Sequence, residues 1–143
     1  MKETSKSQMK TQLFSKNEKL PEMKKEGDTG YDIYMPKAGA LRPGMNVIDL
    51  EVGFEIPAGH LGLILPRSSM AKKGIMTPAP PIDENYRGSV TAYIFNCTGM
   101  AIDYRKNDRV VQLVVFKNAT PEIVGSVLGT SNRGAGKEGT SGK

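Results

Sequence analysis

The chain has 143 residues, of which 38% are hydrophobic and 24% charged, and its formal net charge is +5. This length is typical of one domain and allows a sizeable buried core. No apolar run approaches the roughly 20 residues of a membrane-spanning helix, and the charged first residues do not predict a secretory signal.

One cysteine and one histidine limit the metal and redox chemistry of the chain. Cys97 cannot form an internal disulfide, so we expect a reducing, cytoplasmic compartment. His60 has no thiolate neighbour in the sequence, and this excludes the usual His/Cys metal sites.

The positive charge gathers at the N-terminus. Residues 1–25 hold seven lysines and three glutamates, whereas residues 26–143 hold thirteen basic and twelve acidic side chains. The basic segment has no aromatic side chain before Phe14, and the body is nearly neutral. We therefore expect residues 1–9 to form a disordered, solvated arm, and we do not expect a nucleic-acid partner.

Short apolar segments between glycines and prolines predict a succession of strands. A first strand is expected at residues 11–14, and a charged loop over residues 22–30 leads into a second at residues 31–34. Residues 48–56 alternate apolar and polar side chains without a break, which is typical of one half-buried strand.

The remaining segments complete an all-β pattern. Residues 67–74 predict a polar turn or a single helical turn. Further strands are expected at residues 61–65, 90–95 and 110–116, with a less regular one at residues 121–127. No window has a sustained helical period, so we expect a barrel or sandwich over residues 10–128 and a flexible, Gly-rich tail over residues 129–143.

One stretch combines rigidity with polar chemistry. Proline residues stiffen the approach to Asp83, and Gly88 permits a tight exit toward the next strand. Asp83 and Tyr86 stand three residues apart, so both can face one small ligand from a hairpin. The alternative is an ordinary surface hairpin with solvated charges.

Other polar groups follow predicted strand ends. Arg67, Ser68 and Ser69 offer a guanidinium and hydroxyls suited to a polyphosphate, although the same residues suit a polar turn. Asp32 lies in an apolar strand, where a carboxylate needs a partner, a metal or solvent. Asn107 suits a left-handed turn conformation in which Asp108 and Arg109 form a local ion pair. Gly-rich backbone around Arg133 can wrap a phosphate, or it can remain a plain flexible terminus.

Taken in order, these segments resemble the five motifs of the trimeric-type dUTPase family. The resemblance extends from about residue 11 to the last residue. The matching stretches are Gly30-Tyr31-Asp32-Ile33, Pro66-Arg67-Ser68-Ser69-Met70-Ala71, Ile82-Asp83-Glu84-Asn85-Tyr86-Arg87-Gly88, Asp108-Arg109-Val110-Val111-Gln112-Leu113, and Arg133-Gly134 with Gly139-Thr140-Ser141-Gly142.

The resemblance implies a jelly-roll-like β-barrel (β-clip) protomer, a homotrimer with shared active sites, and Mg²⁺-assisted hydrolysis of dUTP to dUMP and pyrophosphate. It implies that Asp83 is the general base for water attacking the α-phosphate and that Asp32 holds Mg²⁺ through water. Tyr86 would pack under the deoxyribose. The implied substrate-binding residues are Arg67, Ser68, Ser69, Thr77, Pro81, Ile82, Tyr86, Gln112, Arg133, Thr140 and Ser141.

Two positions depart from the family pattern. Lys137-Glu138 replace the usual Gly-Phe, whose ring stacks on uracil, and Pro80-Pro81 replace the usual Gly-Val. Two alternatives therefore stay open. One is a relative acting on another deoxypyrimidine triphosphate, including the deaminase branch of the fold. The other is a catalytically weak, nucleotide-responsive binding or regulatory protein.

Overall fold

The computed structural model describes residues 8–15, 19–23 and 25–136. Most of the expected basic arm therefore lies outside the described residues. The same is true of four positions singled out in the C-terminal tail, namely Lys137, Glu138, Thr140 and Ser141.

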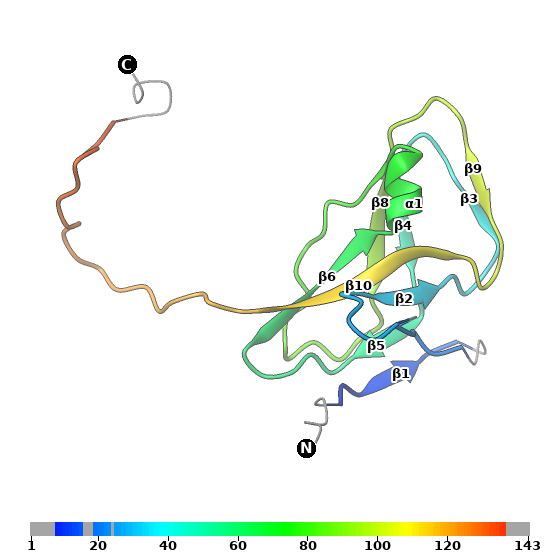
Figure 1. Cartoon of the computed structure of the whole chain (residues 1–143), viewed down its shortest axis with the longest axis horizontal. Helices are drawn as coiled ribbons and strands as arrows, with labels where there is room; N and C mark the ends of the chain where they lie inside the picture. Colours follow the sequence, from blue (N-terminus) through cyan, green and yellow to red (C-terminus); the bar gives the residue numbers. More distant parts are fainter. Residues whose placement is uncertain (1–7, 16–18, 24, 137–143) are drawn as a thin grey trace.

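The described residues form ten short strands and one helical segment (Figure 1). In chain order these elements are β1 (Thr11–Leu13), β2 (Tyr31–Tyr34), β3 (Gly39–Leu41), β4 (Gly44–Asp49), β5 (Val52–Phe54), β6 (His60–Pro66), α1 (Ser68–Lys72), β7 (Ile75–Met76), β8 (Thr91–Asn96), β9 (Ile102–Tyr104) and β10 (Arg109–Lys117). The all-β prediction is confirmed, and α1 is the single helical turn expected after Pro66. No helix in the described ranges is long and apolar enough to span a membrane.

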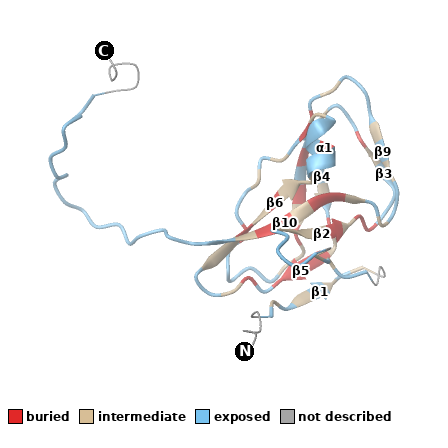
Figure 2. Cartoon of the chain, in the orientation of Figure 1, coloured by how far each residue is buried: buried red, intermediate tan, exposed pale blue. Residues whose placement is uncertain are grey.

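The strands pair into four antiparallel sheets. Two sheets have three strands, in the orders β2-β10-β6 and β4-β8-β7, and two have two strands, β1-β5 and β3-β9. Their inward faces share one apolar core, which Figure 2 shows as buried segments on β5, β10 and the strands around them. Burial of these side chains is the main stabilising term of the fold.

Strand β10 determines where the polar residues of the site lie. It is the central strand of its sheet, with β2 on one side and β6 on the other. Gln112 of β10 is opposite Asp32 of β2 and Leu65 of β6. Because β6 ends at Pro66, Arg67 emerges beside the same end of the sheet. Residues that are distant in sequence therefore converge at one sheet end.

The single strand expected over residues 48–56 is wrong. Leu50, Val52, Phe54 and Ile56 are buried, as the alternation predicts, but β4 ends at Asp49 and β5 starts at Val52. Between them Glu51 adopts a φ of 55°, and its N–H is bonded to the Asp49 carboxylate at 2.8 Å. The chain thus changes sheets at this turn, since β4 pairs with β8 and β5 with β1.

The strand expected over residues 121–127 is also wrong. Residues 118–136 have no regular secondary structure and leave the body as an exposed arm (Figures 1 and 2). Ile123 and Val127 of this arm are 92% and 93% exposed, so no described part of their own chain packs against them. Conversely, the structure contains β3 and β9, which the sequence did not predict. Each has only three residues, too few to show an alternation of apolar and polar side chains.

The core contains one buried polar side chain among the described residues, Asn96 at the end of β8. Its amide donates to the carbonyls of Leu41 at 2.9 Å and Met100 at 2.8 Å. Its oxygen accepts from the backbone N–H and the hydroxyl of Thr98. Asn96 therefore joins β8 to β3 and organises the turn that follows.

Replacing Asn96 by alanine should lower the free energy of unfolding by about 2 kcal/mol or more, because the carbonyl of the buried Leu41 loses its donor and the turn at Thr98 loses its acceptor. Chemical denaturation measures this change. The matched control is Asn118→Ala, whose side chain is exposed and accepts only from the N–H of Thr120. Equal stability of the two variants would contradict the role assigned to Asn96.

Candidate functional site

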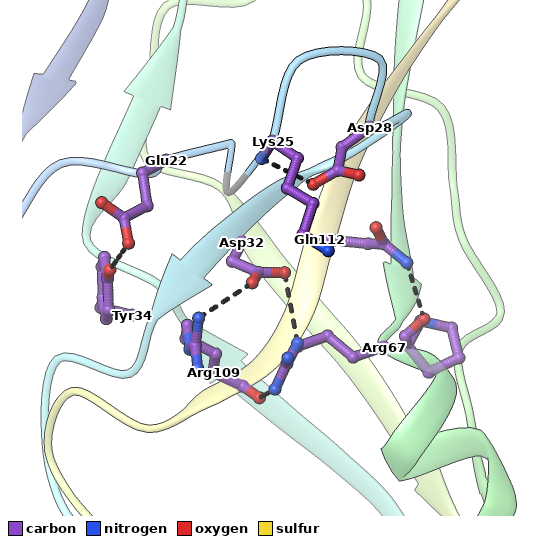
Figure 3. A network of polar contacts seen from close by, with 9 residues as sticks. Glu22, Lys25, Asp28, Asp32, Tyr34, Arg67, Arg109 and Gln112 are labelled. Carbon is purple, nitrogen blue, oxygen red and sulfur yellow. Dashed lines mark hydrogen bonds and ion pairs between the residues drawn. The ribbon is translucent and has the colours of Figure 1, made fainter.

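Asp32 is the centre of a polar network at the end of the β2-β10-β6 sheet (Figure 3). One carboxylate oxygen lies 3.2 Å from Nε of Arg67, and the other lies 3.4 Å from Nη1 of Arg109. Arg67 also donates to the Arg109 carbonyl at 3.0 Å. The Asp32 side chain is only 13% exposed, so this pairing meets the need for a partner that its burial creates.

The network forms one wall of a cavity of about 260 Å³. The cavity is lined by Asp28, Thr29, Gly30, Asp32, Arg67, Ser68 and Gln112. The guanidinium and hydroxyl groups can bind phosphate oxygens, whereas the carboxylate and amide oxygens suit a hydrated divalent cation. The donor set therefore fits an anionic ligand that carries a metal ion.

Gln112 is held by its neighbours in a defined orientation. Its Nε2 donates to the Pro66 carbonyl at 3.1 Å, and its Oε1 lies against the backbone of Gly30. A Cβ at position 30 would lie 2.1 Å from that oxygen. Gly30 is therefore required for steric reasons, because any side chain there would displace the glutamine.

A loop before β2 encloses the cavity on one side. Glu22 and Asp32 exchange two backbone hydrogen bonds of 3.1 and 2.9 Å. The Tyr34 hydroxyl donates to the Glu22 carboxylate, and this hydrogen bond raises the pKa of Tyr34. Asp28 is placed by a turn in which its carboxylate accepts from the Lys25 N–H at 2.9 Å.

The segment that carries Asp83 is a loop rather than a hairpin. One bridge attaches it to β6, in which Ile82 and Gly62 exchange backbone hydrogen bonds of 2.7 and 3.0 Å. Ile82 is buried, and Asp83 follows it at the surface. The loop is thus anchored at the residue next to the proposed base.

Tyr86 lies near the end of this loop, where its side chain contacts the residues that follow it. Its hydroxyl donates to the Ser89 carbonyl at 2.7 Å, and its ring packs on Gly88, where a Cβ would lie 2.4 Å from the hydroxyl oxygen. The ring remains 45% exposed. Tyr86 therefore presents a fixed apolar surface beside Asp83.

The structure divides the predicted residues into two groups. Asp32, Arg67, Ser68 and Gln112 meet in the cavity, and Ser69 lies beside it on α1, lining a neighbouring cavity. The second group, at the start of β6, comprises Asp83, Tyr86, Pro81 and Ile82.

Two further predicted residues lie apart from both groups. The hydroxyl oxygen of Thr77 is buried without a partner among the described residues. Arg133 is exposed on the C-terminal arm, and its Nε donates to the Gly136 carbonyl at 2.9 Å.

Arg109 and Asp28 were not predicted as site residues. Arg109 was expected to pair with Asp108, but its guanidinium reaches Asp32, and the Asp108 carboxylate accepts the Arg105 N–H at 2.7 Å instead. Asn107 has a φ of 71°, the left-handed conformation expected for it. No local signal in the sequence indicates the pairing of Arg109 with Asp32, because it depends on β2 pairing with β10.

An all-β barrel with an oxygen-rich cavity at a sheet end, lined by Arg67 and Ser68 among others, has the kind of donors that a phosphate-binding site needs. The dUTPase family profile matches residues 16–142, and the chain belongs to this family. Its fold is the jelly-roll-like barrel expected from the motifs.

Curated relatives match along nearly the whole chain. The chain is 35% identical to the deoxyuridine 5'-triphosphate nucleotidohydrolase of Kluyveromyces lactis, an alignment that covers 100% of this chain and 99% of the relative. It is 34% identical to the enzyme of the same name from Saccharomyces cerevisiae, with 99% of each chain covered.

Solved structures of phage dUTPases are also similar. A variant of the Staphylococcus bacteriophage 80alpha dUTPase with dUpNHpp has a TM-score of 0.80 and 27% identity, covering 96% of this chain and 100% of that one. A variant of the phage phi11 dUTPase has a TM-score of 0.75 and 25% identity, covering 84% and 97%. The phi11 structure is described with a structural Mg(II) ion.

Asp32→Asn should bind inorganic pyrophosphate about tenfold more tightly than the wild type when no divalent metal is present, because a negative charge is removed from the cavity. Isothermal titration calorimetry measures the Kd. Asp49→Asn is the matched control, since it makes the same change of charge at an exposed position on β4. Unchanged or weaker binding by Asp32→Asn would show that the carboxylate does not repel a bound anion.

Proposed function

We propose that this protein hydrolyses dUTP to dUMP and pyrophosphate, as the names of its relatives indicate. The observation that carries the proposal is the combination of two parts. One is the arginine-lined cavity around Asp32, and the other is the anchored loop that presents Asp83 beside Tyr86. The first part binds phosphates, and the second supplies a base and a surface for a sugar.

Arg67, Ser68 and Gln112 bind the phosphate chain in this proposal. Arg67 and Arg109 outweigh the charge of Asp32, but Asp28 adds a second carboxylate to the cavity, so an anion is favoured by direct hydrogen bonds from Arg67 and Ser68 rather than by net charge. Ser69 adds a hydroxyl from the first turn of α1.

Magnesium fits the same cavity. Asp32 is already paired with two arginines, so it suits a role in which it holds Mg²⁺ through the ion's water molecules rather than directly. Gln112 and Asp28 contribute further oxygen atoms to the lining. When bound, the ion would neutralise charge on the phosphates and orient them.

Asp83 acts as the general base. It removes a proton from a water molecule whose oxygen attacks the α-phosphorus, and the bond from that phosphorus to the oxygen it shares with the β-phosphorus breaks, so this oxygen leaves as part of pyrophosphate. The carboxylate is exposed, so it can reach a water molecule, while the bridge at Ile82 limits its movement.

Tyr86 and the strand-like backbone before Asp83 bind the nucleoside. The exposed ring packs against the deoxyribose and leaves no room for a 2′-hydroxyl. In the proposal Pro81 and Ile82 contact the base, and the Thr77 hydroxyl, which has no partner among the described residues, offers a further polar contact. In the proposal, Arg133, Thr140 and Ser141 close over the phosphates from the C-terminal tail.

We further propose that the site is shared between subunits of a homotrimer. In one protomer Asp83 lies at the start of β6, beside Gly62, whereas Arg67 follows the end of that strand. At about 3.3 Å per residue, Gly62 and Arg67 are roughly 16 Å apart, which is longer than a triphosphate chain. A second protomer is needed to bring a phosphate cavity next to Asp83.

An exposed apolar face supports this assembly. On the β4-β8-β7 sheet, Met45 and Met76 both pair with Phe95, and Val47 pairs with Tyr93. All five side chains are exposed, Val47 to 64% and Met76 to 61%. A contiguous apolar face of this kind is typical of a subunit interface.

The alternatives are less well supported. A regulatory protein without activity needs no base, but Asp83 and Tyr86 are both present in an ordered loop. We expect the protein to act in the cytoplasm, where the exposed Cys97 remains a thiol. Pyrophosphate release from each deoxynucleoside triphosphate and from UTP, with and without Mg²⁺, tests the proposed function directly.

Asp83→Asn should reduce kcat for dUTP about 100-fold or more, because the amide cannot accept the proton of the attacking water. The affinity for a non-hydrolysable dUTP analogue should stay close to that of the wild type. Steady-state kinetics and calorimetry give the two values. Wild-type turnover by this variant would rule out Asp83 as the base.

Mixed oligomers test the shared site. Asp83→Asn and Arg67→Ala protomers, each inactive alone, should recover about one quarter of the wild-type activity when they are refolded together at equal amounts, because that share of interfaces combines an intact base with an intact arginine. Sedimentation should show a trimer. A fully active monomer, or no recovery in an assembled mixture, would contradict the proposal.

A further inference from the structure

The loop that carries Asp83 is supported by a pair of charged side chains that the proposed reaction does not use. We infer that Glu55, acting through Arg87, positions the loop of residues 82–88 for the reaction. Glu55 follows β5, and Arg87 lies on the loop itself, between Tyr86 and Gly88. The inference rests on the proposed function for its kinetic consequence, but its structural consequence can be measured separately.

Arg87 binds the loop from within. Its Nη1 donates to the Glu84 carbonyl at 2.7 Å and to the Tyr86 carbonyl at 3.2 Å. Glu84 lies inside the turn that follows Asp83 and Tyr86 is its last residue, since the Tyr86 N–H donates to the Asp83 carbonyl at 3.1 Å. The guanidinium thus holds the backbone between the proposed base and the sugar-binding ring.

Glu55 sets the position of that guanidinium. One carboxylate oxygen lies 3.4 Å from Nη2 of Arg87, on the side away from the two carbonyls. The backbone of Glu55 is itself fixed, because its N–H donates to the Lys10 carbonyl at 2.9 Å in the pairing of β1 with β5. The support of the loop therefore extends from the N-terminal strand through Glu55 to Arg87.

The ion pair between Glu55 and Arg87 does not act mainly by raising the free energy of unfolding. Arg87 is 56% and Glu55 is 44% exposed, and ion pairs at such exposure add little to the free energy of unfolding. Its effect is geometric. A planar guanidinium with one edge against a carboxylate presents its remaining N–H groups in a fixed direction, which a lysine could not do.

The other contacts of the loop do not fix the backbone between Asp83 and Tyr86 in place of Arg87. The bridge at Ile82 fixes the backbone before Asp83, and Glu84 accepts the Gly59 N–H at a long 3.3 Å. Beyond Glu84, the contacts from Arg87 and the hydroxyl of Tyr86 restrain the described backbone. Because a misplaced base loses much of its effect, releasing Arg87 should act on the chemical step.

Glu55→Gln tests the inference, since it keeps the size of the side chain and removes its charge. We expect kcat for dUTP to fall about tenfold with KM changed less than about twofold, and backbone amides of residues 83–88 to exchange about tenfold faster. The denaturation midpoint should not move. Arg87→Lys should give the same changes, and the double variant should be no worse than either single one.

The matched control is Lys10→Met. Lys10 is the other cation near the Glu55 carboxylate, at 3.9 Å, but no hydrogen bond or ion pair within the described residues joins its side chain to the loop, so kinetics and exchange should remain those of the wild type. Equal effects of Lys10→Met and Glu55→Gln, or normal exchange in Glu55→Gln, would overturn the inference. If the wild type did not hydrolyse dUTP, the proposed function would fail while the exchange measurement still decided the positioning role.

Discussion

The shared pairing of Asp32 with Arg67 and Arg109 is the interaction on which the rest of the site depends. A carboxylate this buried is stable only with partners, and its two partners are Arg109 at the start of β10, the strand next to β2, and Arg67 just after β6, the strand beyond β10. The pairing therefore requires β2, β10 and β6 to be in register. In return, it fixes the guanidiniums of Arg67 and Arg109 on the two oxygens of one carboxylate, where their charges would otherwise repel each other.

Structural features that depend on residues close together in the chain could be predicted from the sequence. The turn after Asp83, the left-handed Asn107 and the short helical turn after Pro66 follow from residue types within a few positions. The partner of Arg109 was not readable in this way. Asp108 adjoins it, but Asp32 lies opposite β10 only after the sheet has formed.

Hydrophobic alternation predicted burial better than it predicted strands. The apolar side chains at positions 50, 52, 54 and 56 are buried as expected, yet the chain changes sheets between Asp49 and Val52. An alternation of apolar and polar residues with a period of two indicates which face of a strand is buried, but it does not indicate which strand pairs with it. In the arm, the apolar residues from Ile123 to Val127 were predicted to form a strand on the assumption that they would be buried, but both ends of this segment are more than 90% exposed.

The contact between Gly30 and Gln112 restricts how sequences of this kind can diverge. No side chain fits at position 30 while the glutamine oxygen occupies that space, and no shorter side chain at position 112 could reach the Pro66 carbonyl in the same way. A single substitution at either position thus removes the contact between the Gly30 backbone and the Gln112 side chain, and only a second substitution at the other position could restore a contact there. The two positions should therefore vary together or not at all among relatives, a correlation that links β2 and β10 in sequence as their pairing links them in space.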